Sequence, residues 1–100
     1  MAHELIVAMH VKDAAGYQRY REAMRPILER YGGGFRHDFV VSETLLTEAA
    51  HPVTRVFAIY FHDRAAKEAF FADAEYLRVK AAHFEGSVGG STIVAAYDRD

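Results

Sequence analysis

The sequence predicts an α+β fold in which one four-stranded antiparallel sheet carries its helices on a single face. Strand and helix patterns follow one another along the chain in the order β-α-β-β-α-β. Hydrophobic residues make up 51% of the chain and charged residues 26%, a composition typical of a globular protein. The length of 100 residues suits one folding unit, so we expect a single domain over residues 1–100.

The first strand and helix are predicted by a change of hydrophobic period near Asp13. Residues 5–11 are short, almost wholly apolar and rich in β-branched side chains, which is typical of a strand buried on both faces. Asp13 is a suitable N-cap, and the apolar residues after it recur in steps of three and four, as in an amphipathic helix. Pro26 lies inside this pattern and lacks a backbone N–H, so we expect a kink or a break there. Three glycines, 32–34, are predicted to end the helix.

The second half of the chain is predicted to hold a hairpin, a helical region and a last strand. Residues 35–47 and 54–61 have strand character and are expected to pair, which would place Val41 opposite Ile59. Asp63 and Asp73 are suitable N-caps for the helices that follow. Residues 91–97 close the chain as the fourth strand.

The predicted element order is that of the split βαβ, or ferredoxin-like, arrangement. Right-handed crossovers place both helices on one face of the sheet, so the second face needs another cover. Both alternating sets of side chains in the third strand are apolar, and the first and fourth strands share this property. A monomer rarely leaves an apolar face of this size exposed. We therefore predict a homodimer that forms through the sheet faces.

Charge and composition exclude several kinds of partner and chemistry. The net charge of −2 without a basic run argues against nucleic acid and against a membrane surface as partners. Cysteine is absent, which removes disulfides and thiolate chemistry and suits a reducing compartment. No apolar stretch is long enough to span a bilayer, and the first residues begin a strand pattern rather than a signal peptide. We expect a cytoplasmic protein.

Several short segments are similar to those of one known family. They are Asp13 followed by Tyr17 and Tyr20, then Tyr31-Gly32-Gly33, then Phe61 just before Asp63-Arg64-Ala65-Ala66, and finally Asp73-Ala74-Glu75-Tyr76. On these segments the chain resembles the family catalogued as domain of unknown function 1330, over nearly its whole length. The resemblance implies a dimeric α+β barrel, in which two ferredoxin-like sheets meet face to face.

The same resemblance implies no single reaction, because the superfamily hosts several. Its members include cofactor-independent quinone-forming monooxygenases, haem-degrading enzymes, muconolactone isomerase-like proteins and small stress proteins. The chain has neither Trp nor Asn, residue types on which the monooxygenases and haem degraders rely, and this argues against those two activities.

Polar residues inside the apolar strands are the candidates for chemistry. With Val41 opposite Ile59, four of them would cluster near one end of the sheet, namely Arg36, Asp38, Tyr60 and His62. An imidazole beside a carboxylate can act as a general base, and an arginine can hold an anionic oxygen. The same cluster would equally form a polar rim of the dimer interface. The candidate catalytic residues are His62, His37 and Tyr60, and the candidate ligand-binding residues are Arg36, Asp38 and His10.

Two functions remain open, and we predict neither a metal site nor a cofactor for them. A metal site would have to use His37 and His62, the only two histidines expected to lie close enough to share an ion, with Asp38 as a third ligand. The first function is a dimer that binds a small apolar or aromatic molecule between sheet and helices. The second is a cofactor-independent monooxygenase or isomerase acting on an aromatic or lactone substrate. The sequence leaves open whether the protein is an enzyme.

Overall fold

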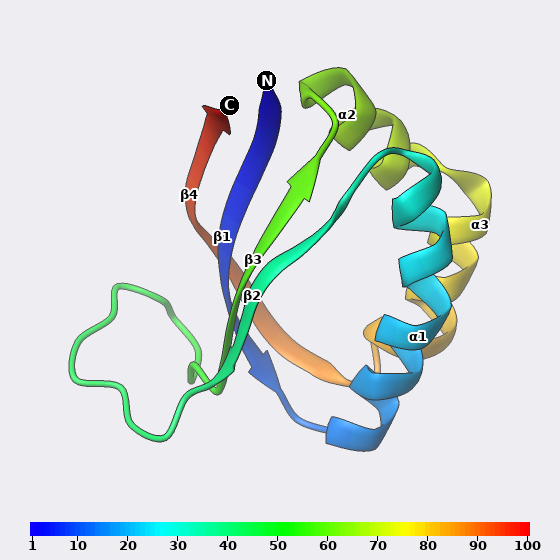
Figure 1. Cartoon of the computed structure of the whole chain (residues 1–100). Helices are drawn as coiled ribbons and strands as arrows, with labels where there is room; N and C mark the ends of the chain where they lie inside the picture. The colour runs from blue at the N-terminus through cyan, green and yellow to red at the C-terminus, as the bar shows by residue number, and fades with distance from the viewer.

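A computed structural model describes residues 1–100, with four strands in one sheet and helices across one face (Figure 1). The strands are β1 (Ala2–Val11), β2 (Gly34–Val40), β3 (Arg55–Phe61) and β4 (Val88–Arg99). The helices are α1 (Ala14–Arg30), α2 (Arg64–Ala72) and α3 (Ala74–Val79), and α3 continues into η1, a π-helical turn over Lys80–Phe84. None of the helices combines the length and the apolarity that a membrane span requires.

The sheet has the order β2-β3-β1-β4, and all neighbouring strands are antiparallel. The two crossovers, through α1 and through α2 and α3, pass over the same face of the sheet (Figure 1). This is the predicted ferredoxin-like arrangement, which the structure confirms. No helix or strand covers the other face, which we call the open face; His51 lies against it at β4, with its Nε2 2.8 Å from the Oγ1 of Thr92.

The helix starts follow the predicted N-caps, because each aspartate accepts a hydrogen bond from a backbone N–H of the first turn. Asp13 accepts from Gly16 at 3.1 Å, and Asp63 accepts from Ala66 at 2.7 Å. Asp73 caps α3 through the N–H of Tyr76 at 2.9 Å. These three predicted caps are confirmed.

Of the kink or break expected at Pro26, the break is wrong, since α1 runs as one helix from Ala14 to Arg30. Pro26 is exposed, so the carbonyl left without its intrahelical partner lies near water. Its neighbours Met24, Ile27 and Leu28 are almost fully buried, and their packing holds the helix on the sheet.

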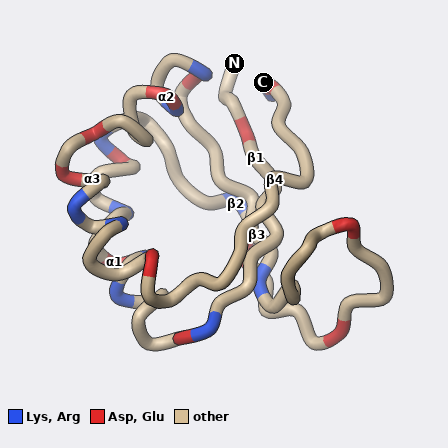
Figure 2. Tube along the Cα trace, turned by 180° about the vertical axis from the view of Figure 1, so that it is seen from behind, with Lys and Arg blue, Asp and Glu red and all other residues tan.

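The expected hairpin is shorter than the sequence pattern suggests. β2 ends at Val40 and not at residue 47, and beyond it a single backbone hydrogen bond follows, from the N–H of Val41 to the carbonyl of Thr54 at 2.9 Å. Phe35, not Val41, therefore lies opposite Ile59, and residues 41–54 form a loop. This loop projects from the sheet on the side away from the helices (Figures 1 and 2). β4 is longer than expected and pairs with β1 from Ala2 to Val11.

A β-bulge at Arg36 changes which side chains of β2 face the helices. The pairing shifts between Phe35 and His37, so Arg36 is an extra residue in the strand. Before the bulge, Phe35 pairs with Ile59 and faces the helices. After it, His37 pairs with Ala58 on the open face and Asp38 pairs with Phe57 on the helix face, so Asp38 is separated from the Tyr60 side chain with which it was expected to cluster.

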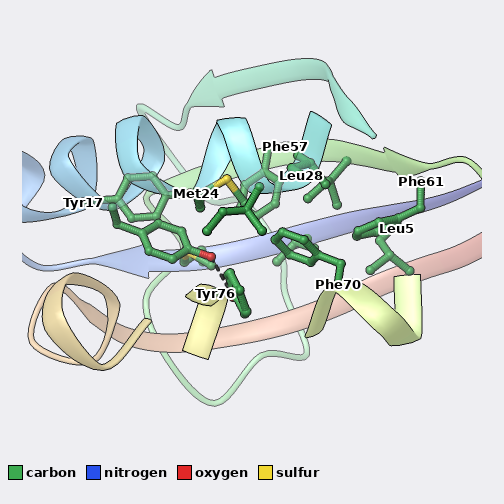
Figure 3. Packing of buried hydrophobic residues seen from close by; sticks show 13 residues of the cluster. Leu5, Tyr17, Met24, Leu28, Phe57, Phe61, Phe70 and Tyr76 are labelled. Atoms are coloured by element: carbon green, nitrogen blue, oxygen red, sulfur yellow. Dashed lines mark hydrogen bonds between the residues drawn. The ribbon is translucent and has the colours of Figure 1, made fainter. Parts of the chain in front are cut away.

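The core lies between the sheet and the helices (Figure 3). Phe61 of β3 and Phe70 of α2 are fully buried, and their ring centroids are 5.7 Å apart. The ring of Phe70 also lies 4.3 Å from that of Tyr76 in α3, so one side chain links three elements. The core comprises Leu5, Val7, Met9, Tyr17, Tyr20, Met24, Ile27, Leu28, Phe57, Ile59, Phe61, Phe70 and Tyr76.

Truncating Phe70 should destabilise the protein strongly, because it leaves a cavity at the centre of this cluster. We expect Phe70→Ala to lower the free energy of unfolding by about 3–5 kcal/mol, measured by urea denaturation at fixed protein concentration. Phe71 is the matched control, since it is the same residue type but 41% exposed. Phe71→Ala should cost about 1 kcal/mol. Equal losses in the two variants would contradict the assignment of Phe70 to the core.

Candidate ligand-binding site

A cavity of about 370 Å³ lies between the sheet and the helices. Its size falls in the range of about 300–1,000 Å³ typical of small-molecule sites, and 13 of its 16 lining residues are hydrophobic. Every strand and helix of the fold contributes to the lining. The lining residues are Leu5, Val7, Met9, Tyr17, Tyr20, Met24, Phe35, Phe57, Ile59, Lys67, Phe71, Tyr76, Lys80, Phe84, Ser91 and Ile93.

Aromatic side chains form one wall of this cavity. The ring centroid of Tyr20 in α1 lies 5.8 Å from that of Tyr17, 6.3 Å from that of Tyr76 and 5.0 Å from that of Phe84. The rings come from α1, α3 and η1, because the apolar stripe of α1 packs against both later segments. Such a wall offers flat apolar surface to an aliphatic or aromatic ligand.

The wall carries one pair of hydroxyl groups. The oxygens of Tyr20 and Tyr76 are 2.8 Å apart and share a hydrogen bond (Figure 3). One hydroxyl proton serves this bond, and the other is free to be donated to an oxygen of a ligand. Burial raises the pKa of Tyr20 and that of Tyr76, so both stay neutral at physiological pH. The pair can donate a hydrogen bond but cannot act as a base.

The lining contains no histidine and no acidic residue, and its only charged members are Lys67 of α2 and Lys80 of η1. The third polar member is Ser91 of β4. Ile93, also in β4, lines the cavity and is 60% exposed. The cavity therefore opens to solvent along β4, beyond the edge of the helix layer.

Asp38 lies in an ion-pair cluster beside the cavity and not in its lining. Arg55 donates two hydrogen bonds to its carboxylate, both of 2.7 Å, and Arg21 donates one of 2.8 Å. Desolvation raises the pKa of Asp38, but the bonds from Arg55 and the charge of Arg21 outweigh it and hold the pKa below its usual range. The Arg21 guanidinium also lies 3.6 Å from the ring centroid of Phe35. The cluster ties α1 to β2 and β3 and supports the cavity wall.

A second polar cluster lies on the open face, around Glu4. This side chain is only 2% exposed and accepts hydrogen bonds from Arg36, Tyr97 and, at 3.4 Å, Arg99. The Arg36 guanidinium lies 4.2 Å from the ring centroid of Tyr60. Desolvation raises the pKa of Glu4, but the bonds from Tyr97 and Arg36 outweigh it, so the pKa is lowered.

The expected cluster of Arg36, Asp38, Tyr60 and His62 does not form. Arg36 and Tyr60 meet on the open face, whereas the bulge turns Asp38 to the helix face. His62 follows the end of β3, is exposed, and has its Cβ beside Gly32. The expected closeness of His37 and His62, with Asp38 beside them, is not found, since His37 and Asp38 lie on opposite faces of the sheet and His62 lies beyond the end of β3. No three His, Asp or Glu side chains come together in a group that could hold a metal ion.

The two other histidines singled out in the sequence also lie outside the cavity. His37 stacks on Phe39 on the open face, with ring centroids 5.6 Å apart. His10 lies near the end of β1, beside Gly89. Neither residue has a hydrogen-bond partner that would orient its imidazole as a base.

Sequence reasoning missed the two cavity lysines and the buried Glu4. An acid within an otherwise apolar strand was the available signal for Glu4. For the lysines, the available signal was their spacing from aromatic residues. Lys67 lies four residues before Phe71, and Lys80 lies four residues before Phe84, so each lysine shares a helix face with an apolar ring.

Comparison with known proteins supports the fold and names no activity for the chain. A family model described as "Domain of unknown function (DUF1330)" matches residues 5–97. A solved protein of unknown function from Rhodopseudomonas palustris is similar, with a TM-score of 0.79 and 17% identity over 93% of this chain and 78% of that one. No curated protein matches the sequence.

Two further solved structures share the fold. A dimeric ferredoxin-like protein of unknown function from Jannaschia sp. CCS1 has a TM-score of 0.59 and 13% identity, over 99% of this chain and 100% of that one. SnoaB, a cofactor-independent oxygenase from Streptomyces nogalater, has a TM-score of 0.64 and 17% identity, over 99% of this chain and 93% of that one. At these identities the similarity shows the fold alone.

Glu4 should make part of the stability depend on acid pH. Its pKa in the folded chain lies below the ordinary value of 4.5, so its contribution is present above that pH and is lost as pH falls through the lower, folded pKa. We expect Glu4→Gln to lose less unfolding free energy between pH 7 and pH 3 than the wild type does, measured by urea denaturation. The exposed Glu68→Gln should follow the wild-type profile. Parallel profiles for Glu4→Gln and wild type would contradict the pairing of Glu4.

Proposed function

The chain belongs to the family described as "Domain of unknown function (DUF1330)", and from this premise we propose that it is a small homodimer that binds an apolar or aromatic molecule. The observation that carries the proposal is the cavity between sheet and helices, whose lining is hydrophobic at 13 of 16 positions. An apolar ligand that enters it gains about 25 cal/mol for each Å² of apolar surface removed from water. The rigid aromatic wall around Tyr20 is already formed, so little ordering is needed when the ligand binds.

Binding without turnover agrees better with the lining than catalysis does. SnoaB is described as a cofactor-independent oxygenase, but this chain's similarity to it extends to the fold alone. The candidate catalytic residues His62, His37 and Tyr60 are all outside the lining. Tyr60 lines a separate, more polar pocket with Arg21 and Arg25, and neither His37 nor His62 reaches that pocket. The two buried tyrosine hydroxyls in the apolar cavity are neutral.

The open face supports the dimer. Its centre is apolar: Ala8 and Ala58 are already buried there, Ile6 and Val56 are half-buried, and Phe39 beside them is 57% exposed. The loop of residues 41–54 projects on the same side of the sheet and carries two leucines that are about nine-tenths exposed, Leu45 and Leu46. A second copy seated on the open face would cover these groups. The Jannaschia relative is itself described as dimeric.

Ligand binding can be tested with N-phenyl-1-naphthylamine, a neutral aromatic probe that fluoresces in apolar surroundings. We expect saturable binding to the wild type and at least about tenfold weaker binding to Ser91→Phe, which adds a ring to the cavity lining. Ser42→Phe makes the same change in the exposed loop and should bind as the wild type does. Absence of saturable binding to the wild type, or equal affinity in Ser91→Phe, would overturn the proposed site.

The dimer can be tested by size-exclusion chromatography with light scattering. We expect the wild type to show twice the mass of one chain and Ile6→Lys to show the mass of one chain, because the ammonium would be buried unpaired at the interface. Leu77→Lys is the control, since Leu77 is 47% exposed on α3, within the helix layer. A wild-type monomer would contradict the dimer. Circular dichroism verifies that each variant is folded.

A further inference from the structure

The charges of the cavity lining have one sign. The chain contains three lysines, and two of them, Lys67 and Lys80, line the cavity, while Lys12 lies elsewhere. Neither cavity lysine takes part in an ion pair, and no acidic side chain lies in the lining to neutralise them. This contrasts with the rest of the fold, where Asp38 and Glu4 are each paired with arginines.

Lys80 lies beside the aromatic wall. Its Nζ lies 5.9 Å from the ring centroid of Phe84, which also packs against Tyr20. Both residues belong to η1, where the N–H of Glu85 donates to the carbonyl of Lys80 at 3.2 Å in a π-helical turn. Such turns are rare and occur frequently at functional sites. Lys67 lies on α2 one turn before Phe71, and both line the cavity.

An ammonium group beside an apolar cavity favours a particular class of ligand. Both lysines are partly buried, so their charges are screened less than charges on an open surface. A charge in such surroundings is stabilised most by a partner of opposite sign. The Tyr20–Tyr76 pair adds a neutral hydrogen-bond donor that is suited to an anionic oxygen.

We infer that the ligand of this cavity is an organic acid, with an apolar or aromatic body inside the cavity and its acidic group paired with Lys80. Lys67 adds a second positive charge that attracts the same anion. The inference rests on the proposed function and deepens it by naming the ligand class. It also assigns unequal roles to the two lysines, because only Lys80 contacts the aromatic wall.

The test compares two probes that share one ring skeleton. N-phenyl-1-naphthylamine is neutral, and 1-anilinonaphthalene-8-sulfonate adds one sulfonate to it. Fluorescence titration gives the Kd of both for the wild type and for Lys80→Gln, Lys67→Gln and Lys12→Gln. Lys12→Gln is the matched control, since it makes the same change outside the lining.

We expect Lys80→Gln to weaken binding of the sulfonate probe by about tenfold and to leave binding of the neutral probe within about twofold. Lys67→Gln should weaken the sulfonate probe by less, and Lys12→Gln should change neither probe. Ser91→Phe should weaken both probes, which verifies that the sulfonate binds in the cavity. Raising the salt concentration should weaken only the sulfonate probe.

The possible failures separate the two proposals. If the neutral probe binds and Lys80→Gln weakens both probes equally, or neither, the acid inference is overturned while the proposed function stands. The same conclusion follows if the neutral probe binds in the cavity and the sulfonate probe does not. If neither probe binds the wild type, both the inference and the proposed function are overturned.

Discussion

The constraint on which this structure depends is that the sheet has two apolar faces and the chain has helices for only one. β1 and β3, at the centre, present apolar side chains in both directions, with Leu5 and Ile59 toward the helices and Ile6 and Ala58 away from them. The helix layer also stops short of β4, where Ile93 stays 60% exposed. The apolar cavity along β4 and the open face both follow from this shortage of cover.

Charged residues within the strands serve mainly to connect strands of the sheet with one another, and Arg21 also connects α1 to the sheet. The carboxylates of Asp38 and Glu4 are each enclosed by arginines, and their pKa values are lowered although both groups are desolvated. A carboxylate held in this way is a poor proton acceptor and has few free positions for a ligand. The cavity has the opposite character, since its lysines are unpaired and its tyrosine hydroxyls are neutral. The structure thus separates the acids that stabilise the fold from the cations that can recognise a ligand.

The candidate site could be predicted from the sequence only in part. The tyrosines of α1 were recognisable as one helical stripe, and a ligand site between sheet and helices followed from the fold class. The polar cluster of Arg36, Asp38, Tyr60 and His62 was not predictable, because its composition depends on the pairing register. A single extra residue at Arg36 and a loop over 41–54 decide that register, and neither carries a strong local signal.

The sequence by itself determined the features that short-range interactions control. The aspartate caps, the apolar stripe of α1, the order of the elements and the doubly apolar strands all follow from hydrogen bonds and periodicities within a few residues. Only the tertiary structure decided which face His37 and Asp38 occupy, that Glu4 is buried, and that Lys67 and Lys80 line one cavity. These outcomes depend on contacts between segments far apart in the chain, which a local pattern can indicate but cannot determine.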